Sequence, residues 1–192
     1  MQELKDRIVK EGKVLPGNII KVDGFLNHRI DTELMDHIAA EFGKHFNMDE
    51  VTMILTAEAS GIALSAIVAH HFHKPMIFAK KAKSDNIEGG LYQSDIFSYT
   101  YKKKVTLLVS KEWISADDKI LIIDDFMANG EAMRGLCDIV KAAGATLVGI
   151  GCAVEKGFQG GGDRLRAAGV NLKSLAIIES AEPGNIVFWD ED

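Results

Sequence analysis

The chain has 192 residues, 47% of them apolar, which suffices for one well-buried core and hardly for two. A formal net charge of −6 argues against nonspecific binding to nucleic acid. Alternating charges follow Met1 where a signal peptide would carry an apolar block, and no apolar run approaches a length of about 18 residues. We therefore predict one domain over residues 1–192, located in the cytoplasm, with no nucleic-acid and no membrane partner.

In chain order, the sequence begins with a predicted amphipathic helix over 2–11, a short strand over 18–22 and a turn over 23–30. Asp31 can cap a helix whose apolar residues recur at core spacing. Apolar runs then predict further strands, over residues 51–56, 75–79, 105–110, 120–123, 146–154 and 174–179. Helical patterns separate most of these strands, an alternation typical of an α/β fold with a central parallel sheet flanked by helices.

The most informative segment runs from Ile120 to Ala132. Four consecutive apolar residues predict a strand buried on both faces, and a periodic apolar pattern from Glu131 predicts the helix that follows. Sheets of α/β proteins bind ligands in the loop between such a strand and helix. The backbone N–H groups of residues 128–132 have no partner within the helix and can bind a phosphate, which Gly130 allows to come close.

Two carboxylates, Asp124 and Asp125, stand between this strand and the loop. A carboxylate only accepts hydrogen bonds, as the vicinal hydroxyls of a ribose require. The segment therefore predicts a site for a ribose and its 5′-phosphate. The structural alternative is the strand, turn and helix of an ordinary doubly wound domain, in which the two aspartates only cap the turn.

Residues 120–132 resemble the phosphoribosyl pyrophosphate (PRPP) motif of the type I phosphoribosyltransferases: four hydrophobic residues, two acids, two hydrophobic residues, two small residues and a glycine. Members of that family often carry Ser or Thr at the small positions, so here the backbone and Asn129 must supply the phosphate contacts. The resemblance implies that Asp124 and Asp125 are catalytic. It also implies that PRPP contacts five residues of the loop, which are Ala128, Asn129, Gly130, Glu131 and Ala132.

The same resemblance implies the type I phosphoribosyltransferase fold. In that fold a core would span about residues 31–154, and a small hood would be formed by about residues 13–30 and 155–190. We therefore expect the central sheet in the core and the base-recognising residues in the hood.

A second loop that could bind a phosphate group spans residues 56–61. It joins a strand to a helix and offers small residues, a hydroxyl and backbone donors. In the family the equivalent turn binds the leaving pyrophosphate, which implies that Glu58, Ser60 and Gly61 contact PRPP. The alternative is a helix start that Ser60 caps for stability.

Lys81 stands at the start of a polar loop over about residues 82–100, whose length suggests a lid. A lid would exclude water from the reacting ribose, and a lysine at its hinge would neutralise the departing pyrophosphate. We predict that Lys81 contacts PRPP, in preference to Lys83. A solvated surface loop is the alternative.

Segments 18–28 and 155–159 resemble the xanthine phosphoribosyltransferases, and this resemblance extends over almost the whole chain. It implies that Ile20, Asn27 and Lys156 contact the purine. A lysine ammonium only donates, so Lys156 suits the 6-oxo group of an oxopurine and disfavours the amino group of adenine. Asn27 can donate or accept, and therefore does not strictly separate xanthine from guanine.

The resemblance thus implies a homodimeric enzyme that transfers phosphoribose from PRPP to xanthine, giving xanthosine monophosphate in purine salvage. Mg²⁺ would arrive on PRPP, because pyrophosphate oxygens and waters satisfy its octahedral geometry, and no all-protein metal site is expected. Two alternatives stay open: a hypoxanthine-guanine enzyme of the same chemistry, and a non-catalytic regulator that senses PRPP.

Two other features are interpreted structurally. Four glycines within residues 157–162 lack the order of a dinucleotide-binding fingerprint and are predicted to form a turn. Cys137 and Cys152 lack the spacing of a paired framework and are predicted to be reduced core residues.

Overall fold

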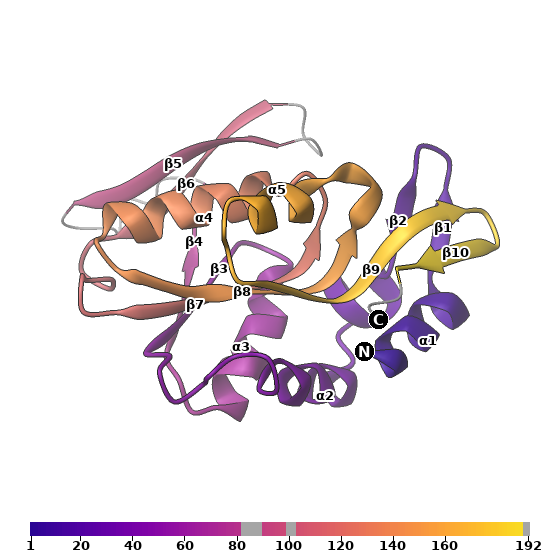
Figure 1. The fold of residues 1–192 in the computed structure, drawn as a ribbon, viewed down its shortest axis with the longest axis horizontal. Coiled ribbons are helices and arrows are strands. Elements are labelled where there is room, and N and C mark those ends of the chain that lie inside the picture. The colour runs from indigo at the N-terminus through magenta and orange to yellow at the C-terminus, as the bar shows by residue number, and fades with distance from the viewer. Residues whose placement is uncertain (82–89, 99–102, 190–192) are drawn as a thin grey trace.

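A computed structural model describes residues 1–81, 90–98 and 103–189, and its centre is a six-stranded sheet (Figure 1). Five strands run parallel and one edge strand, β10, runs antiparallel to its neighbour. The sheet order is β10-β9-β8-β7-β3-β4. The strand bounds are β3 (Met53–Ala57), β4 (Met76–Ala79), β7 (Lys119–Met127), β8 (Thr146–Lys156), β9 (Leu172–Glu182) and β10 (Asn185–Phe188). The predicted α/β class with a mainly parallel central sheet is confirmed.

Helices cover both faces of this sheet (Figure 1). One face carries α2 (Thr32–Phe42) and α3 (Gly61–His71), and the other carries α4 (Glu131–Ala142) and α5 (Gly161–Ala167). An antiparallel hairpin of β5 (Leu91–Ser98) and β6 (Lys103–Ser110) packs on the outer side of α4. The molecule is therefore layered, with the sheet between two helical layers.

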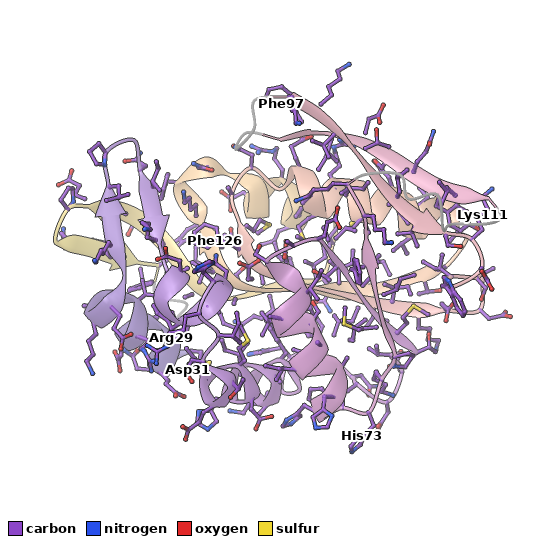
Figure 2. The ribbon with its side chains drawn as sticks, turned by 180° about the vertical axis from the view of Figure 1, so that it is seen from behind. Arg29, Asp31, His73, Phe97, Lys111 and Phe126 are labelled. Atoms are coloured by element: carbon purple, nitrogen blue, oxygen red, sulfur yellow. The ribbon has the colours of Figure 1, made fainter. Side chains whose placement is uncertain are left out.

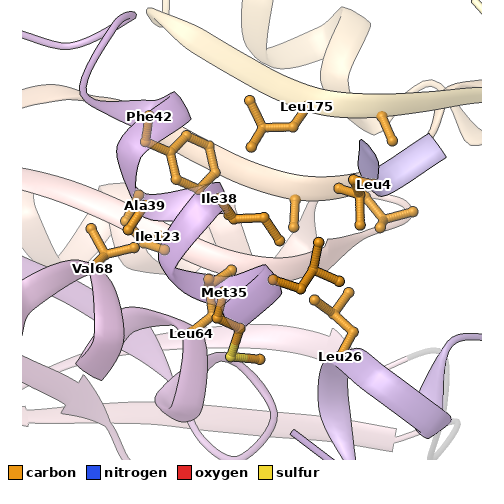
Figure 3. Close-up of a cluster of buried hydrophobic side chains, with 14 of the residues drawn as sticks. Leu4, Leu26, Met35, Ile38, Ala39, Phe42, Leu64, Val68, Ile123 and Leu175 are labelled. Carbon is orange, nitrogen blue, oxygen red and sulfur yellow. The ribbon is translucent and has the colours of Figure 1, made fainter. Parts of the chain in front are cut away.

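Strand β7 shows why a continuous apolar run was needed at the centre. Its residues Ile120–Ile123 are all fully buried, and their side chains alternate between the two faces. Leu121 and Ile123 belong to the apolar cluster with α2 and α3, whereas Ile120 and Ile122 belong to the cluster with α4 and the hairpin. Figure 3 shows Ile123 among side chains of the first cluster. The predicted burial on both faces is confirmed.

The N-terminal segment lies at the β9–β10 end of the sheet (Figure 1). It contains α1 (Gln2–Glu11), the hairpin of β1 (Lys13–Leu15) and β2 (Ile19–Lys21), and the π-helical turn η1 (Asp23–Asn27). Asp31 caps α2 as predicted, because its carboxylate accepts the Leu34 N–H at 3.2 Å. The same carboxylate pairs with Arg7 of α1, so that the cap also ties α1 to α2.

Two local predictions differ from the structure, and a third falls largely outside the described residues. Residues 91–98 lie in the predicted polar loop but form β5, because pairing with β6 along its whole length outweighs the polar composition. The turn predicted over 157–162 is confirmed at 157–160, which contain the 3-10 turn η2 (Gly157–Gln159), but it is wrong at 161–162, where α5 begins. Residues 82–89 and 99–100 of the predicted lid lie outside the described residues, so the lid stays a prediction.

Part of the range expected for the hood belongs to the sheet. Strand β9 pairs in parallel with β8 from Leu172 to Ile178, beyond the predicted core boundary at about residue 154. The division into core and hood stays a prediction.

Among the described helices, each is too short or too polar to span a bilayer. Cys152 is buried and Cys137 half-buried, and both are free thiols.

Candidate active site

The candidate site lies where the order of the sheet changes direction. After β3 the chain moves outward to β4, and after β7 it moves to β8 on the opposite side. The loops that follow the adjacent strands β3 and β7 therefore diverge at their carboxyl ends and leave a crevice between them. A cavity of about 220 Å³ occupies this position. Its lining residues are Ala57, Glu58, Ser60, Lys81, Ile96, Phe97, Asp124, Phe126, Met127, Ala128, Asn129, Gly130, Glu131, Ala132 and Met133.

The two aspartates lie within β7 and not beyond its end, which corrects the expectation from sequence. The strand continues to Met127 because its pairing with β8 extends as far as Glu155. Asp124 lines the cavity. Asp125 is 1% exposed and is held by two donors, the Ser60 hydroxyl at 2.8 Å and the Asn27 side-chain amide at 3.0 Å. One carboxylate therefore faces the cavity while the other joins three segments beside it.

The electrostatics of the pair favour a ligand that donates hydrogen bonds or carries positive charge. Burial raises the pKa of Asp124 well above its usual range, and the neighbouring charge of Asp125 raises it further. The charge of Lys81 acts in the opposite direction. A bound diol would supply donors to this carboxyl group and would offset its loss of water.

Gly61 explains how α3 can begin so close to Asp124. A side-chain Cβ at this position would lie 2.2 Å from the Asp124 Oδ1 atom and 2.3 Å from the Thr56 Oγ1 atom. Gly61 therefore does not line the cavity but allows the acidic residue and the helix start to approach each other. Its contribution to a PRPP site would act through Asp124.

The loop after β7 has the form expected of a phosphate-binding loop. Gly130 precedes α4 with φ of +74°, a left-handed conformation that favours glycine. The N-cap residue is this glycine, which has no side chain to cap the helix, so the first backbone N–H groups of α4 can serve a ligand. These groups and the positive end of the helix dipole adjoin the cavity that Asp124 lines.

The side chain of Glu131 connects this loop to the hairpin. Its carboxylate accepts the Arg134 guanidinium at 3.1 Å and the Phe97 backbone N–H of β5 at 3.3 Å. The hydrogen bond from Arg134 is the main reason why the pKa of Glu131 is lowered. Because its carboxylate is already engaged, Glu131 offers the site its backbone N–H.

Three predicted PRPP contacts line the opposite wall: Glu58 and Ser60 of the loop after β3, and Lys81 after β4. The Glu58 carboxylate accepts the backbone N–H of Lys81, which ties this loop to the end of β4. Ser60 stands at the N-cap position of α3 but makes no capping bond with its side chain. Its hydroxyl donates to Asp125 instead, so the helix-cap interpretation does not describe this serine.

The predicted purine contacts lie beside the cavity and not in its lining. Asn27 ends η1 and reaches the acid pair through Asp125. Lys156 is the last residue of β8. Its ammonium group lies 5.4 Å from the centre of the Phe126 ring and donates to the Asn18 carbonyl at 2.9 Å. Burial lowers the pKa of Lys156. Ile20 of β2 is 7% exposed and belongs to the apolar cluster on the α2 side.

Sequence reasoning missed the apolar part of the lining. Phe126 lies at the strand end between the acid pair and the loop, and Figure 2 shows it near the end of the sheet that faces η1. Its position directly after Asp125 was a usable signal, because the next residue of a strand end borders the same crevice. Ile96 and Phe97 of β5 gave no such signal, since only the folded hairpin brings them to the cavity.

Comparisons with known proteins agree with this geometry. Residues 23–168 match the model of the phosphoribosyl transferase domain family. The xanthine phosphoribosyltransferase of Bifidobacterium animalis subsp. lactis (strain AD011) is 52% identical over 191 residues, covering 98% of this chain and 99% of the relative. The protein of the same name from Clostridium novyi (strain NT) is 46% identical over 188 residues, which cover 98% of this chain and 99% of that relative.

Solved structures support the fold. The adenine phosphoribosyltransferase of Giardia lamblia in complex with 9-deazaadenine superimposes with a TM-score of 0.76, at 20% identity and with coverage of 93% of this chain and 98% of that one. The Rhodothermus marinus adenine phosphoribosyltransferase gives a TM-score of 0.73, at 20% identity and with coverage of 93% and 100%. At such identities the likeness concerns the fold alone. With the near-full-length relatives above, the chain belongs to the phosphoribosyltransferase family and, within it, to the xanthine phosphoribosyltransferases.

Proposed function

We propose that this protein transfers the 5-phosphoribosyl group of PRPP to xanthine and releases pyrophosphate, giving xanthosine 5′-monophosphate. The observation that carries the proposal is a cavity between β3 and β7 where the buried Asp124, with Asp125 beside it, meets the glycine-led start of α4. A carboxylate for the ribose and backbone N–H groups for its 5′-phosphate are the two contacts that the phosphoribosyl group needs.

In this proposal the phosphoribosyl group lies along the cavity from Asp124 to the start of α4. Asp124 and Asp125 accept the ribose hydroxyls, and the backbone of Ala128, Asn129, Gly130, Glu131 and Ala132 binds the 5′-phosphate. The dipole of α4 adds to this binding because its positive end faces the anion. The ribose is thereby fixed at both ends.

The pyrophosphate would lie against the opposite wall, at Glu58, Ser60 and Lys81, with Gly61 allowing the close approach of α3. Lys81 supplies positive charge as the leaving group departs, and its charge already acts on Asp124. Binding at two loops on separate strands orients the bond that breaks between them.

Mg²⁺ fits the chemistry of this cavity. The donors at hand are carboxylate oxygens, which this hard cation prefers, and the raised pKa of Asp124 shows a buried acid pair that a cation would relieve. Among the described residues, no cluster of three or more His, Cys, Asp or Glu could hold a metal ion by itself. In our proposal Mg²⁺ would arrive on PRPP, Asp124 and Asp125 would help to hold it, and its charge would offset that of the pyrophosphate.

The base would lie on the side of Phe126, between the ribose and the hood residues Ile20, Asn27 and Lys156. Lys156 lies within reach of the Phe126 ring and can donate to the 6-oxo group. Asp125 is a pure acceptor when ionised, so the Asn27 amide nitrogen must face it. The Asn27 oxygen and its second N–H therefore remain for the 2-position and the neighbouring ring nitrogen of the base.

Catalysis in this arrangement is electrostatic. As the bond to pyrophosphate breaks, positive charge develops on the ribose near the Asp124 and Asp125 carboxyl groups, which stabilise it. The base nitrogen then bonds to the ribose from the side of Phe126, and its proton passes to the departing pyrophosphate. The protein thus supplies position and electric field, and no residue needs to form a covalent bond with the substrate.

A steady-state assay tests the proposal, with PRPP, Mg²⁺ and each of five bases: xanthine, guanine, hypoxanthine, adenine and uracil. We expect the highest kcat/KM with xanthine and no turnover with adenine. Preference for hypoxanthine or guanine would assign the alternative oxopurine activity. PRPP binding without turnover of any base would assign the sensing alternative, and turnover with adenine alone would contradict the role of Lys156.

We further propose that the enzyme works as a homodimer in the cytoplasm, as the family resemblance implies. Light scattering coupled to size-exclusion chromatography tests the first statement: a monomer mass at assay concentrations would overturn it. Fractionation of the native cells tests the second.

A further inference from the structure

Helix α5 lies directly behind the loop that we propose as the 5′-phosphate site. A side-chain Cβ at Gly161, the first residue of α5, would lie 2.2 Å from the Ala128 carbonyl oxygen and 2.7 Å from the Gly130 nitrogen. From the other side, a Cβ at Gly130 would lie 3.4 Å from the Gly161 Cα. The two backbones are therefore in contact with no side chain between them.

Arg164, one turn later in α5, bonds to the same loop. Its guanidinium donates to the Asn129 carbonyl oxygen at 3.0 Å. In a trans peptide unit the C=O and the following N–H point in opposite directions. Because the Asn129 carbonyl points at the Arg164 guanidinium, the Gly130 N–H points away from that guanidinium.

The helix that makes these contacts is itself anchored to the sheet. Glu155 of β8 is fully buried and accepts both terminal nitrogens of Arg166, at 3.0 and 2.8 Å. The Ser174 hydroxyl of β9 donates to the same carboxylate. Gly162 gives this ion pair its space, since a Cβ there would lie 1.9 Å from the Glu155 Oε1 atom. Helix α5 therefore cannot move away from the loop without breaking a buried ion pair.

We propose that Gly161 and Arg164 are positioning residues for the 5′-phosphate: they hold the carbonyls of the loop against α5 and so aim its N–H groups at the ligand. The buried Glu155–Arg166 pair keeps α5 in place for this task. The proposal rests on the proposed function, because it takes residues 128–132 as the phosphate site. It gives a role to the glycine-rich segment that sequence analysis interpreted as a turn.

The test compares binding of two ligands that would occupy opposite walls of the cavity. Dissociation constants for xanthosine 5′-monophosphate and for pyrophosphate with Mg²⁺ are measured by calorimetry, together with KM for PRPP and for xanthine. Gly161→Ala should weaken binding of the monophosphate about 10- to 100-fold, since the loop must shift to admit the methyl group. Arg164→Ala should weaken it about 3- to 10-fold.

Pyrophosphate affinity and KM for xanthine should stay unchanged in both variants, and Arg164→Lys should restore part of the loss because it keeps a donor. Gly24→Ala is the matched control, since a methyl group there meets open space. Alanine favours a helix more than glycine does, so loss of binding in Gly161→Ala would not come from helix propensity. A general loss of structure would weaken the binding of both ligands equally.

The outcomes separate this inference from the proposed function. Wild-type protein that neither binds xanthosine 5′-monophosphate nor forms it would overturn both. Wild-type protein that does both, with unchanged monophosphate affinity in Arg164→Ala, would overturn the positioning role alone. Should Gly161→Ala fail to fold, the Arg164 variants decide by themselves, because this side chain is exposed and its removal leaves the core intact.

Discussion

At the scale of single residues, the acid pair combines two different environments. Asp125 accepts hydrogen bonds from Ser60 and Asn27, whereas the buried Asp124 accepts the backbone N–H of Asp125 at 3.1 Å. The Thr56 hydroxyl close to Asp124 is also buried without a hydrogen-bond partner among the described residues. The unpaired Thr56 hydroxyl and the buried Asp124 carboxyl group lie beside the proposed ribose site, which is where a protein keeps binding capacity at the expense of stability.

Asp124→Asn should stabilise the ligand-free protein at neutral pH. The folded-state pKa of Asp124 is raised by burial and then by Asp125, so its protonated form favours folding. This contribution is complete below the unfolded pKa of about 3.9 and is lost as the pH rises through the folded pKa. At pH 8 the variant should therefore unfold at a higher temperature than wild type. The expected shift is about 2–4 °C for each kcal/mol by which the free energy of unfolding rises.

Thermal unfolding followed by circular dichroism between pH 4 and pH 8 measures this difference. The gain should shrink toward pH 4, where wild type also carries a neutral group at this position. An unfolding temperature difference that is independent of pH would show that the charge of Asp124 is not its source. Enzyme activity should fall in the same variant, because an amide accepts fewer hydrogen bonds from a diol.

Asp125→Asn should lower kcat/KM by about 100-fold while the fold stays intact. The Asn27 amide can rotate and present its oxygen to the new amide group, so the contact between η1 and β7 survives. The negative charge beside the ribose is lost, and Asn27 faces the base in the wrong orientation. Steady-state kinetics and circular dichroism measure the two effects, and unaltered kinetics would remove this carboxylate from the mechanism.

At the scale of elements, β7 and α5 divide the work at the site. Strand β7 carries the acid pair and the phosphate loop in one continuous segment, and its apolar half fixes it between two cores. Helix α5 contributes no side chain to the lining but lies against the loop and is fastened by the Glu155–Arg166 pair. Local spacing encodes the first element, and a buried ion pair holds the second.

Arg166→Ala should destabilise the protein because, among the described residues, it leaves the buried Glu155 carboxylate with the Ser174 hydroxyl as its side-chain donor. Loss of one partner of a buried pair costs about 3–5 kcal/mol, and the partial exposure of Arg166 places this case at the lower end. Chemical denaturation measures the change. Arg164→Ala is the control and should stay within about 0.5 kcal/mol of wild type.

Adding Glu155→Gln to the Arg166 variant should recover part of the lost stability, since it removes the unpaired charge. If Arg166→Ala has the same free energy of unfolding as wild type, the ion pair does not anchor α5. The inference that Gly161 and Arg164 of this helix position the phosphate loop then loses its support.

At the scale of the whole molecule, the N-terminal and C-terminal segments lie close to each other (Figure 1). The Met1 ammonium donates to the Leu175 carbonyl of β9, and Lys5 of α1 donates to the Trp189 carbonyl near the C-terminus. Leu4 and Ile8 of α1 are fully buried in the cluster that includes Ile123 of β7. The first helix is therefore part of the apolar core and not an appendage.

Leu4→Ala should lower the free energy of unfolding by about 2–5 kcal/mol, as removal of a fully buried leucine side chain does. Val9→Ala on the same helix is the matched control, because Val9 is 63% exposed and its truncation should change stability by no more than about 0.5 kcal/mol. Urea denaturation measures both. Equal stabilities would show that α1 does not pack on the core.

Local patterns were sufficient for most of the framework. The apolar run Ile120–Ile123 predicted a strand buried on two faces, and Asp31 predicted a helix start, because each depends only on nearby residues and on the period of the backbone. β5 was missed because its polar residues become a strand only by pairing with β6. α5 was missed because its two leading glycines are unfavourable in a helix and are required by contacts with residues 128 and 155.

By itself, the sequence determined the α/β class, the acid pair and the loop that follows it, since these are written in residues adjacent along the chain. Only the tertiary structure decided that Asn27 and Ser60, 98 and 65 residues away, converge on Asp125, and that α5 lies behind the loop. The physical reason is distance along the chain: such contacts form when the sheet order and the packing of its faces are complete, and no local period encodes either.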